Sequence, residues 1–122
     1  MARNGLIAPG HKRAIQALLW GIKPLIDLRG SIPLPYVLTF LTVALEEGKS
    51  VGAYAREMSI NRFLMSRYMR CIGDRGRNGG AGLGLVTIKR ISNSPTRTAV
   101  FLTDKGRAVA AQVYRNLGHT AE

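Results

Sequence analysis

Residues 50–73 of this 122-residue chain read SVGAYAREMSINRFLMSRYMRCIG, and this stretch decides the predicted fold. The pattern predicts two short helices, 51–58 and 62–72, joined by a tight turn. Ser50 and Asn61 stand where a side-chain oxygen can accept a hydrogen bond from the first free N–H groups of each helix. We therefore interpret the stretch as a helix-turn-helix.

The apolar residues of both helices recur at helical spacing, so each helix offers one face to a shared core. They are Tyr54, Ala55 and Met58 in the first helix, Ile60 in the turn, and Met65, Tyr68, Met69 and Ile72 in the second. Cys71 is the only cysteine, which excludes an intrachain disulfide and a cysteine-rich zinc site. Its place inside the second helix favours a buried thiol.

The opposite face of the second helix is basic and predicts contact with DNA. It carries Arg62, Phe63, Ser66, Arg67 and Arg70, and the two capping residues, Ser50 and Asn61, are predicted to contact DNA as well. Arginine pairs with guanine edges or with phosphates, and a helix fits the major groove of B-DNA. The alternative interpretation is a solvated basic face on an ordinary core helix.

The charge distribution supports a polyanionic partner. The net charge is +11 and the pI is near 10.9. Residues 49–90 hold nine Lys and Arg against two acidic residues, a net +7, whereas residues 31–48 hold only Glu46 and Glu47. A DNA-binding protein is expected to carry its excess charge on the helix-turn-helix and its flank, as this chain does.

Several classes of protein are not expected from the composition. No apolar run approaches the roughly 18 residues of a membrane span, and residues 1–13 lack a signal peptide's apolar stretch. We therefore expect a cytoplasmic, nucleoid-associated protein without membrane contact. No catalytic triad or paired carboxylates stand out, so an enzyme is not expected. His11 and His119 lie far apart without an acidic cluster, so neither a metal nor another cofactor is expected.

The N-terminal region predicts an arm and a helix. Residues 1–10 suggest a flexible basic arm that could follow phosphates, although a frayed terminus is commoner. Residues 11–28 predict an amphipathic helix, and Pro24 is expected to kink or break it after Ile22. Its apolar stripe holds Ile15, Leu18, Leu19, Ile22 and Ile26. Such a stripe packs either on a partner subunit or within the chain, and both remain open.

A further helix is expected to start at Pro35, with Gly48 as its C-cap. Its core-facing residues would be Tyr36, Val37, Phe40, Leu41, Ala44 and Leu45. The glycine-rich run 73–84 lacks the GxxxxGK[ST] pattern and leads from a helix into a strand, so it predicts a connector rather than a phosphate loop. Arg75 and Arg77 within it could contact a nucleic-acid backbone.

Residues 85–92 and 97–102 predict a β-hairpin, because β-branched residues flank a proline-containing turn. A hairpin directly after a helix-turn-helix is a wing, and Lys89, Arg90 and Arg97 flank its tip. A solvated hairpin is the alternative. Residues 103–118 predict a last helix, capped by Thr103, with His119 in a frayed tail. Its apolar stripe holds Val109, Ala110, Val113, Tyr114 and Leu117.

This order of elements resembles the MarR family of bacterial transcription regulators over about residues 32–112. Three segments carry the resemblance: LPYVLTFLTVALEEG, SVGAYAREMSINRFLMSRYMRCI and VFLTDKGRAVAAQ. Tyr54-Ala55 stands at the family's usual Leu-Ala, Ser66-Arg67 at its Ser-Arg, and 102–106 match its Leu-Thr-x-x-Gly. The chain departs from the family in its wing tip, where Ser94-Pro95-Thr96 replaces Asp-x-Arg, in its longer glycine-rich link, and in its single C-terminal helix.

The resemblance implies a homodimer knitted by the terminal helices, with one recognition helix in each half-site of a roughly palindromic duplex. The expected interface residues are Ile15, Leu18, Leu19, Ile22, Ile26, Val113, Tyr114 and Leu117. A small-molecule effector, common in that family, cannot be read from this sequence.

The sequence thus predicts a mainly α fold with a β-hairpin (α+β): a winged helix-turn-helix with additional N- and C-terminal helices, in a single domain over 11–122. The predicted function is a sequence-specific, dimeric regulator of transcription that binds double-stranded DNA. One alternative is a winged-helix module for nucleoprotein assembly in plasmid or phage replication, partition or DNA transfer. Another is a basic module that binds protein or RNA.

Overall fold

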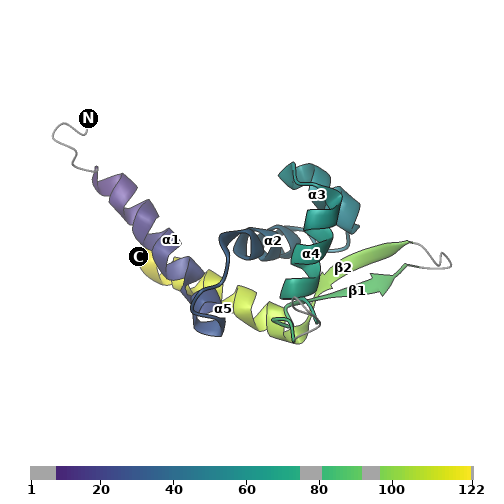
Figure 1. The fold of residues 1–122 in the computed structure, drawn as a ribbon. Helices are drawn as coiled ribbons and strands as arrows, with labels where there is room; N and C mark the ends of the chain where they lie inside the picture. The colour runs from purple at the N-terminus through teal and green to yellow at the C-terminus, as the bar shows by residue number, and fades with distance from the viewer. Residues whose placement is uncertain (1–7, 75–80, 92–96, 122) are drawn as a thin grey trace.

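The structure, a computed structural model, describes residues 8–74, 81–91 and 97–121. Over these residues it is mainly helical with one antiparallel hairpin, as predicted. The elements are α1 (Pro9–Leu28), α2 (Leu34–Leu45), α3 (Val51–Met58), α4 (Arg62–Ile72), β1 (Val86–Arg90), β2 (Thr98–Leu102) and α5 (Asp104–Ala121). Helices α1 and α5 lie side by side at one end, whereas α3, α4 and the hairpin form the other end (Figure 1).

The helix-turn-helix has the predicted boundaries because its capping residues act locally. The Ser50 hydroxyl accepts a hydrogen bond of 3.1 Å from the Ala53 N–H. The Asn61 side chain accepts one of 2.7 Å from the Phe63 N–H and one of 3.4 Å from Leu64. Both predicted caps are therefore confirmed, and the backbone at the start of α4 is held rigidly.

The core lies where α2, α3, α4 and the hairpin meet. Its fully buried large side chains include Phe40, Val43, Tyr54, Met65, Met69, Ile72, Leu85 and Val100. Cys71 is buried as expected, and Tyr68 is half-buried with its ring 5.8 Å from that of Tyr36. The predicted apolar face of α4 is therefore the face that packs into the core, which leaves the basic face outside.

The strands are shorter than predicted, since Leu85, Ile91 and Arg97 lie outside them. The Ile91 N–H still donates to the Arg97 carbonyl at 3.0 Å. The register of the hairpin pairs Val86 with Leu102 and Ile88 with Val100. Paired residues share a face of the hairpin. On this face Val86, Val100 and Leu102 are buried in the core, whereas Ile88, nearer the tip, is exposed. The turn predicted at 93–96 lies outside the described residues, as do Arg75 and Arg77.

Of the two outcomes predicted at Pro24, a kink or a break after Ile22, the break does not occur. Helix α1 starts at Pro9, inside the predicted arm, and continues through Pro24 to Leu28. Proline fits the first position of a helix because the N–H it lacks would have no helical partner there. Pro24 is tolerated because a side chain of α5 bonds to the carbonyl oxygen that its missing N–H leaves free.

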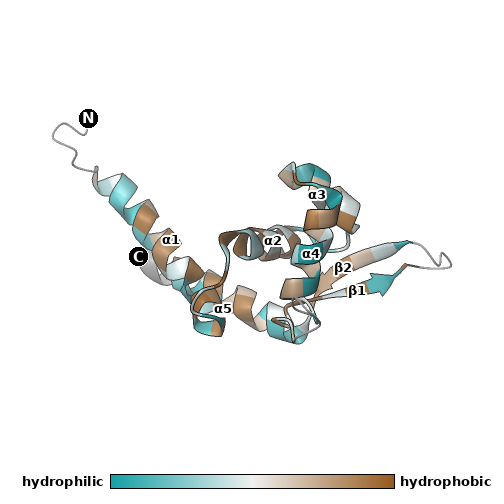
Figure 2. Ribbon diagram, in the orientation of Figure 1, coloured by the Kyte–Doolittle hydropathy of each residue, from teal (hydrophilic) through white to brown (hydrophobic). Residues whose placement is uncertain are grey.

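The predicted end of the second helix is also wrong. Helix α2 ends at Leu45, so Gly48 is not its C-cap but a linker residue with φ of +93°, whose N–H donates to the Val100 carbonyl at 2.8 Å. Leu45, predicted in the core, is 87% exposed. Helix α2 is mostly hydrophobic along its length (Figure 2), so periodicity could not separate its two faces.

Helix α5 runs three residues past the predicted end at 118, to Ala121, so its helix includes position 119. Its start is fixed by Thr103, whose hydroxyl donates to the Gly84 carbonyl at 2.5 Å and accepts from the Gly106 N–H at 3.0 Å. A Cβ at position 106 would overlap the Leu85 carbonyl oxygen. The Leu-Thr-x-x-Gly pattern therefore joins the cap of α5 to the chain entering the hairpin.

Candidate nucleic-acid interface

The exposed side of α4 is the surface on which the predicted DNA-contacting residues gather. Phe63, Arg67 and Arg70 are exposed and Ser66 is half-buried, and they lie at positions i, i+4, i+7 and i+3 of one stripe. The opposite stripe is buried in the core. None of the ion pairs found in the described part of the chain involves an arginine of α4. These guanidinium groups are therefore available to an external anion.

A groove of about 550 Å³ separates the start of α4 from the hairpin. Its helix side is lined by Ser50, Val51, Arg62 and Ser66, and its hairpin side by Ile88, Ile91, Arg97 and Thr98. The structure thus brings together four of the predicted site residues from three separate segments. The groove combines two guanidinium groups and three hydroxyls with an isoleucine-rich wall.

The two basic residues of β1 point to different faces of the hairpin. Arg90 pairs with Thr98 and shares the face of Ile88, which lines the groove. Lys89 lies on the opposite face, and its ammonium group is 5.8 Å from the centre of the Phe101 ring. Figure 2 shows that β1 becomes hydrophilic toward its end, whereas most of β2 is apolar. Lys89 therefore does not line the groove.

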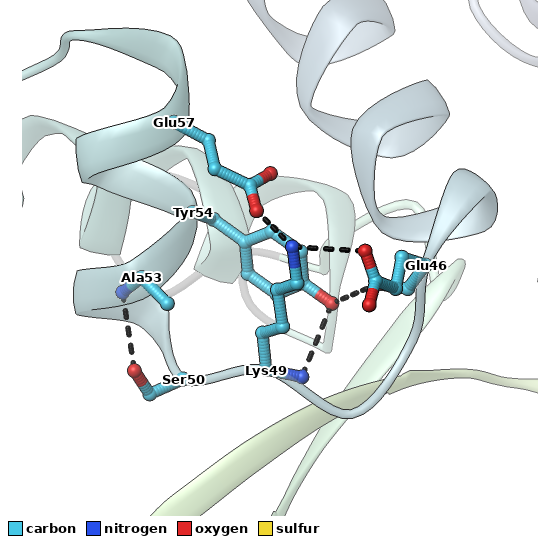
Figure 3. Close-up of polar contacts among 6 residues, drawn as sticks. All are labelled: Glu46, Lys49, Ser50, Ala53, Tyr54 and Glu57. Atoms are coloured by element: carbon cyan, nitrogen blue, oxygen red, sulfur yellow. Dashed lines mark hydrogen bonds and ion pairs between the residues drawn. The ribbon is translucent and has the colours of Figure 1, made fainter.

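Lys49 belongs to a surface cluster of polar residues, in which carboxylates surround it, rather than to the exposed basic face of α4 (Figure 3). Its ammonium group pairs with Glu57 and, at 3.0 Å, with Glu46. These carboxylates raise the pKa of Lys49, Glu57 most strongly. The buried Tyr54 hydroxyl donates to the Glu46 carbonyl at 2.6 Å and accepts from the Lys49 N–H at 3.3 Å, and burial raises its pKa. Part of the local positive charge is thus neutralised.

Glu47 ties the link before α3 to the end of the hairpin and to α5. Its carboxylate accepts from the Leu102 N–H at 2.8 Å and from both terminal nitrogens of Arg107, at 2.9 and 3.0 Å. The Leu102 N–H, and then Arg107, lower the pKa of Glu47. Sequence reasoning missed this role, since its only signal was an acidic pair in a basic chain. The contact positions the hairpin relative to the helix-turn-helix.

The predicted interface residues of the terminal helices divide into two groups. Ile15, Leu18, Leu19, Ile26 and Tyr114 are exposed. By contrast, Ile22 packs against the core and Val113 is half-buried. Leu117 is 39% exposed but also contacts α1, since a Cβ at Gly21 would lie 2.9 Å from its Cδ2. Part of each stripe therefore serves packing within the chain, which was the alternative left open.

The exposed part of α1 is broad for a helix of this length. Only Gly21, Pro24 and Leu25 of its twenty residues are buried. A hollow of about 330 Å³ on its outer side is lined by Leu19, Trp20, Lys23, Ile26 and Asp27. Among the residues that the structure describes, no three His, Cys, Asp or Glu side chains gather to hold a metal ion, and no helix is long and apolar enough to cross a bilayer.

No protein-family model matches the sequence, and no curated protein matches it. Solved structures share its fold. RV1404 from Mycobacterium tuberculosis aligns with a TM-score of 0.69 at 14% identity, over 90% of this chain and 70% of its own. A MarR-like transcriptional regulator from Thermotoga maritima aligns at 0.66 and 16% identity, over 95% and 79%. A MarR-family transcriptional regulator from Silicibacter pomeroyi aligns at 0.56 and 14%, over 92% and 68%. The chain therefore has a MarR-like winged-helix fold.

Proposed function

We propose that this protein is a sequence-specific regulator of transcription that binds double-stranded DNA as a homodimer, with α4 of each subunit in the major groove. The observation that carries the proposal is the exposed stripe of α4, whose arginines make no ion pair within the described residues. Guanidinium groups held on a rigid, capped helix suit both base edges and phosphates.

The groove beside α4 supports the same conclusion. Arg62 and Arg97 stand on its two sides, 35 residues apart in the sequence, and Ser50 and Ser66 add hydroxyl donors. Phosphates bind guanidinium and hydroxyl groups, whereas Ile88 and Ile91 offer an apolar surface to deoxyribose. A sugar–phosphate strand passing between helix and wing would use every one of these groups.

We propose that the second subunit binds to the outer side of α1 and α5. Leu18 and Leu19 are 62% and 64% exposed, and Ile15, Ile26 and Tyr114 extend the apolar surface. A monomer would leave this surface in water, at a cost that rises with its area. A second copy covers it with the same patch, as a two-fold interface does.

Selection from a randomised duplex library at about physiological salt tests the proposal. An enriched inverted repeat with half-sites about one helical turn apart is the result expected of a dimer that reads two major grooves. Specific binding should also survive excess competitor DNA, whereas attraction by charge alone should not. A library with no enriched motif, and with binding that collapses as salt rises, would contradict the proposal.

A further inference from the structure

Phe63 is the most conspicuous side chain of α4 that the core does not use. It is 85% exposed, whereas Phe40 is fully buried and Phe101 is half-buried beneath Lys89. Phe63 is the second residue of α4, and the Asn61 side chain holds its N–H at 2.7 Å. An aromatic ring is therefore presented to the exterior at the capped start of the helix, without packing into the core.

The neighbours of Phe63 identify the surface that the ring meets. Ser66, Arg67 and Arg70 follow it at i+3, i+4 and i+7 of the same stripe. These are the residues proposed to enter the major groove, and Phe63 stands at the end of the stripe nearest the start of the helix. The ring thus lies beside polar groups that suit a nucleic acid, rather than within an apolar patch that suits a protein.

The major-groove edges of the bases offer one apolar group, the C5 methyl of thymine. Apart from the small C5–H of cytosine, the other groups that distinguish the base pairs there are hydrogen-bond donors or acceptors. A ring packed over such an edge would remove water from a polar atom without replacing its hydrogen bond, which is unfavourable. A phenylalanine on a major-groove helix therefore both attracts thymine and disfavours the other bases.

We propose that Phe63 contacts the C5 methyl group of a thymine in each half-site and thereby selects a T·A pair at one position. This inference rests on the proposed function, because it requires α4 to lie in the major groove. The other use of an exposed aromatic ring on DNA is insertion between base steps. Inserted side chains generally act from the minor groove, so we assign the ring to the methyl group instead.

A deoxyuridine scan tests the assignment on the wild-type protein. In the selected duplex, each thymine is replaced singly by uracil, which pairs identically but lacks the methyl group. We expect one position in each half-site at which the replacement weakens binding about fourfold, the factor that corresponds to burial of one such group. The remaining thymines should tolerate the replacement.

Variants then assign the effect to this residue. In Phe63→Ala the thymine and uracil duplexes should bind equally, and Phe63→Leu should retain part of the difference. Leu34→Ala, which also truncates an exposed apolar side chain but on α2, should retain all of it. Circular dichroism of each variant checks folding, and the scan of the wild-type protein stands whether or not a variant folds.

The outcomes distinguish failure of the thymine assignment from failure of the proposed DNA-binding function. If selection yields a motif but no thymine is sensitive, or if the sensitivity persists in Phe63→Ala, the assignment is wrong while the DNA-binding function stands. If Phe63→Ala reduces the bend of the bound duplex instead, the ring inserts between bases and the assignment is again wrong. If no duplex is selected, the inference and the proposed function fail together.

Discussion

The side-chain amide of Asn116, on α5, donates a hydrogen bond of 2.8 Å to the main-chain carbonyl of Trp20, on α1. That carbonyl lacks its helical donor because the residue four positions later is Pro24, which has no N–H. Asn116 is oriented in turn by Gln112, whose amide donates to its oxygen at 2.8 Å. One side chain thus compensates a proline in a neighbouring helix and fastens the two terminal helices together.

Asn116→Ala should therefore lower the free energy of unfolding by about 1 kcal/mol, because it leaves the Trp20 carbonyl without its donor. Urea denaturation at fixed protein concentration measures the change. In a Pro24→Ala background the new N–H can bond to that carbonyl, so the same substitution should cost less. Equal costs in both backgrounds would show that Asn116 does not act through the carbonyl that Pro24 leaves free.

Two glycines of α5 should respond to alanine in opposite directions. Gly106→Ala should destabilise the protein by about 1–3 kcal/mol or more, because the new Cβ overlaps the Leu85 carbonyl. A backbone carbonyl cannot move aside as a flexible side chain can. Gly118→Ala has no atom within 4 Å of its Cβ and should stabilise by about 0.5–1 kcal/mol through helix propensity. Thermal unfolding of the matched pair measures both, and a stabilising Gly106→Ala would contradict the packing described.

Glu47→Gln should make the protein less stable by about 1 kcal/mol at neutral pH, because the charged hydrogen bonds to Leu102 and Arg107 are lost or weakened. The folded pKa of Glu47 lies below its ordinary value of 4.5. Its contribution is therefore complete above about pH 4.5 and is lost as the pH falls through the lowered folded value. Denaturation of both proteins from pH 7 to pH 3 should show the difference narrowing, and a constant difference would argue against a role for the charge.

Arg67→Ala should weaken binding to the selected duplex by about 1–3 kcal/mol and relax the base preference at one position, if Arg67 pairs with a base. Arg29→Ala removes the same charge from an exposed position before α2, outside α4, and should leave the preference intact. Fluorescence anisotropy against single-base variants of the duplex measures both. Unchanged affinity and preference in Arg67→Ala would exclude it from base readout.

The double variant Leu18→Glu, Leu19→Glu should be monomeric, because it places charges at the centre of the proposed α1 interface. Light scattering coupled to gel filtration reports the mass directly. Leu45→Glu introduces the same residue type at a more exposed leucine at the end of α2 and should leave the mass at that of the dimer. A double variant that keeps the wild-type mass would move the interface elsewhere.

The helix-turn-helix was predictable because its signals are local. Ser50 and Asn61 fix where two helices begin through bonds to residues two or three positions away, and the buried side of α4 follows from periodicity. The face of α4 from Phe63 to Arg70, which does not pack into the core, is then predicted to be exposed. Fold class and the exposed basic helix could be reasoned from sequence for this reason.

The remaining features depend on residues distant in the chain. Helix α1 continues through Pro24 because Asn116, 92 residues later, bonds to the free carbonyl. The charge of Lys49 is neutralised by Glu46, directly after α2, and Glu57, on α3. The groove between Arg62 and Arg97 joins segments 35 residues apart. Strand β2 is held to the link before α3 there, since the Val100 N–H donates to the Lys49 carbonyl at 2.9 Å.

Hydrogen bonds and periodicity between residues close in the sequence thus determined where the helices lie and which of their faces are apolar or basic. Tertiary contacts determined that the Trp20 carbonyl accepts a hydrogen bond from Asn116 and that Lys49 is paired with carboxylates. They also left Leu45 exposed to solvent. The physical reason is that each carbonyl, charge and apolar side chain needs an interaction partner, and in these cases the partner belongs to another element of the fold.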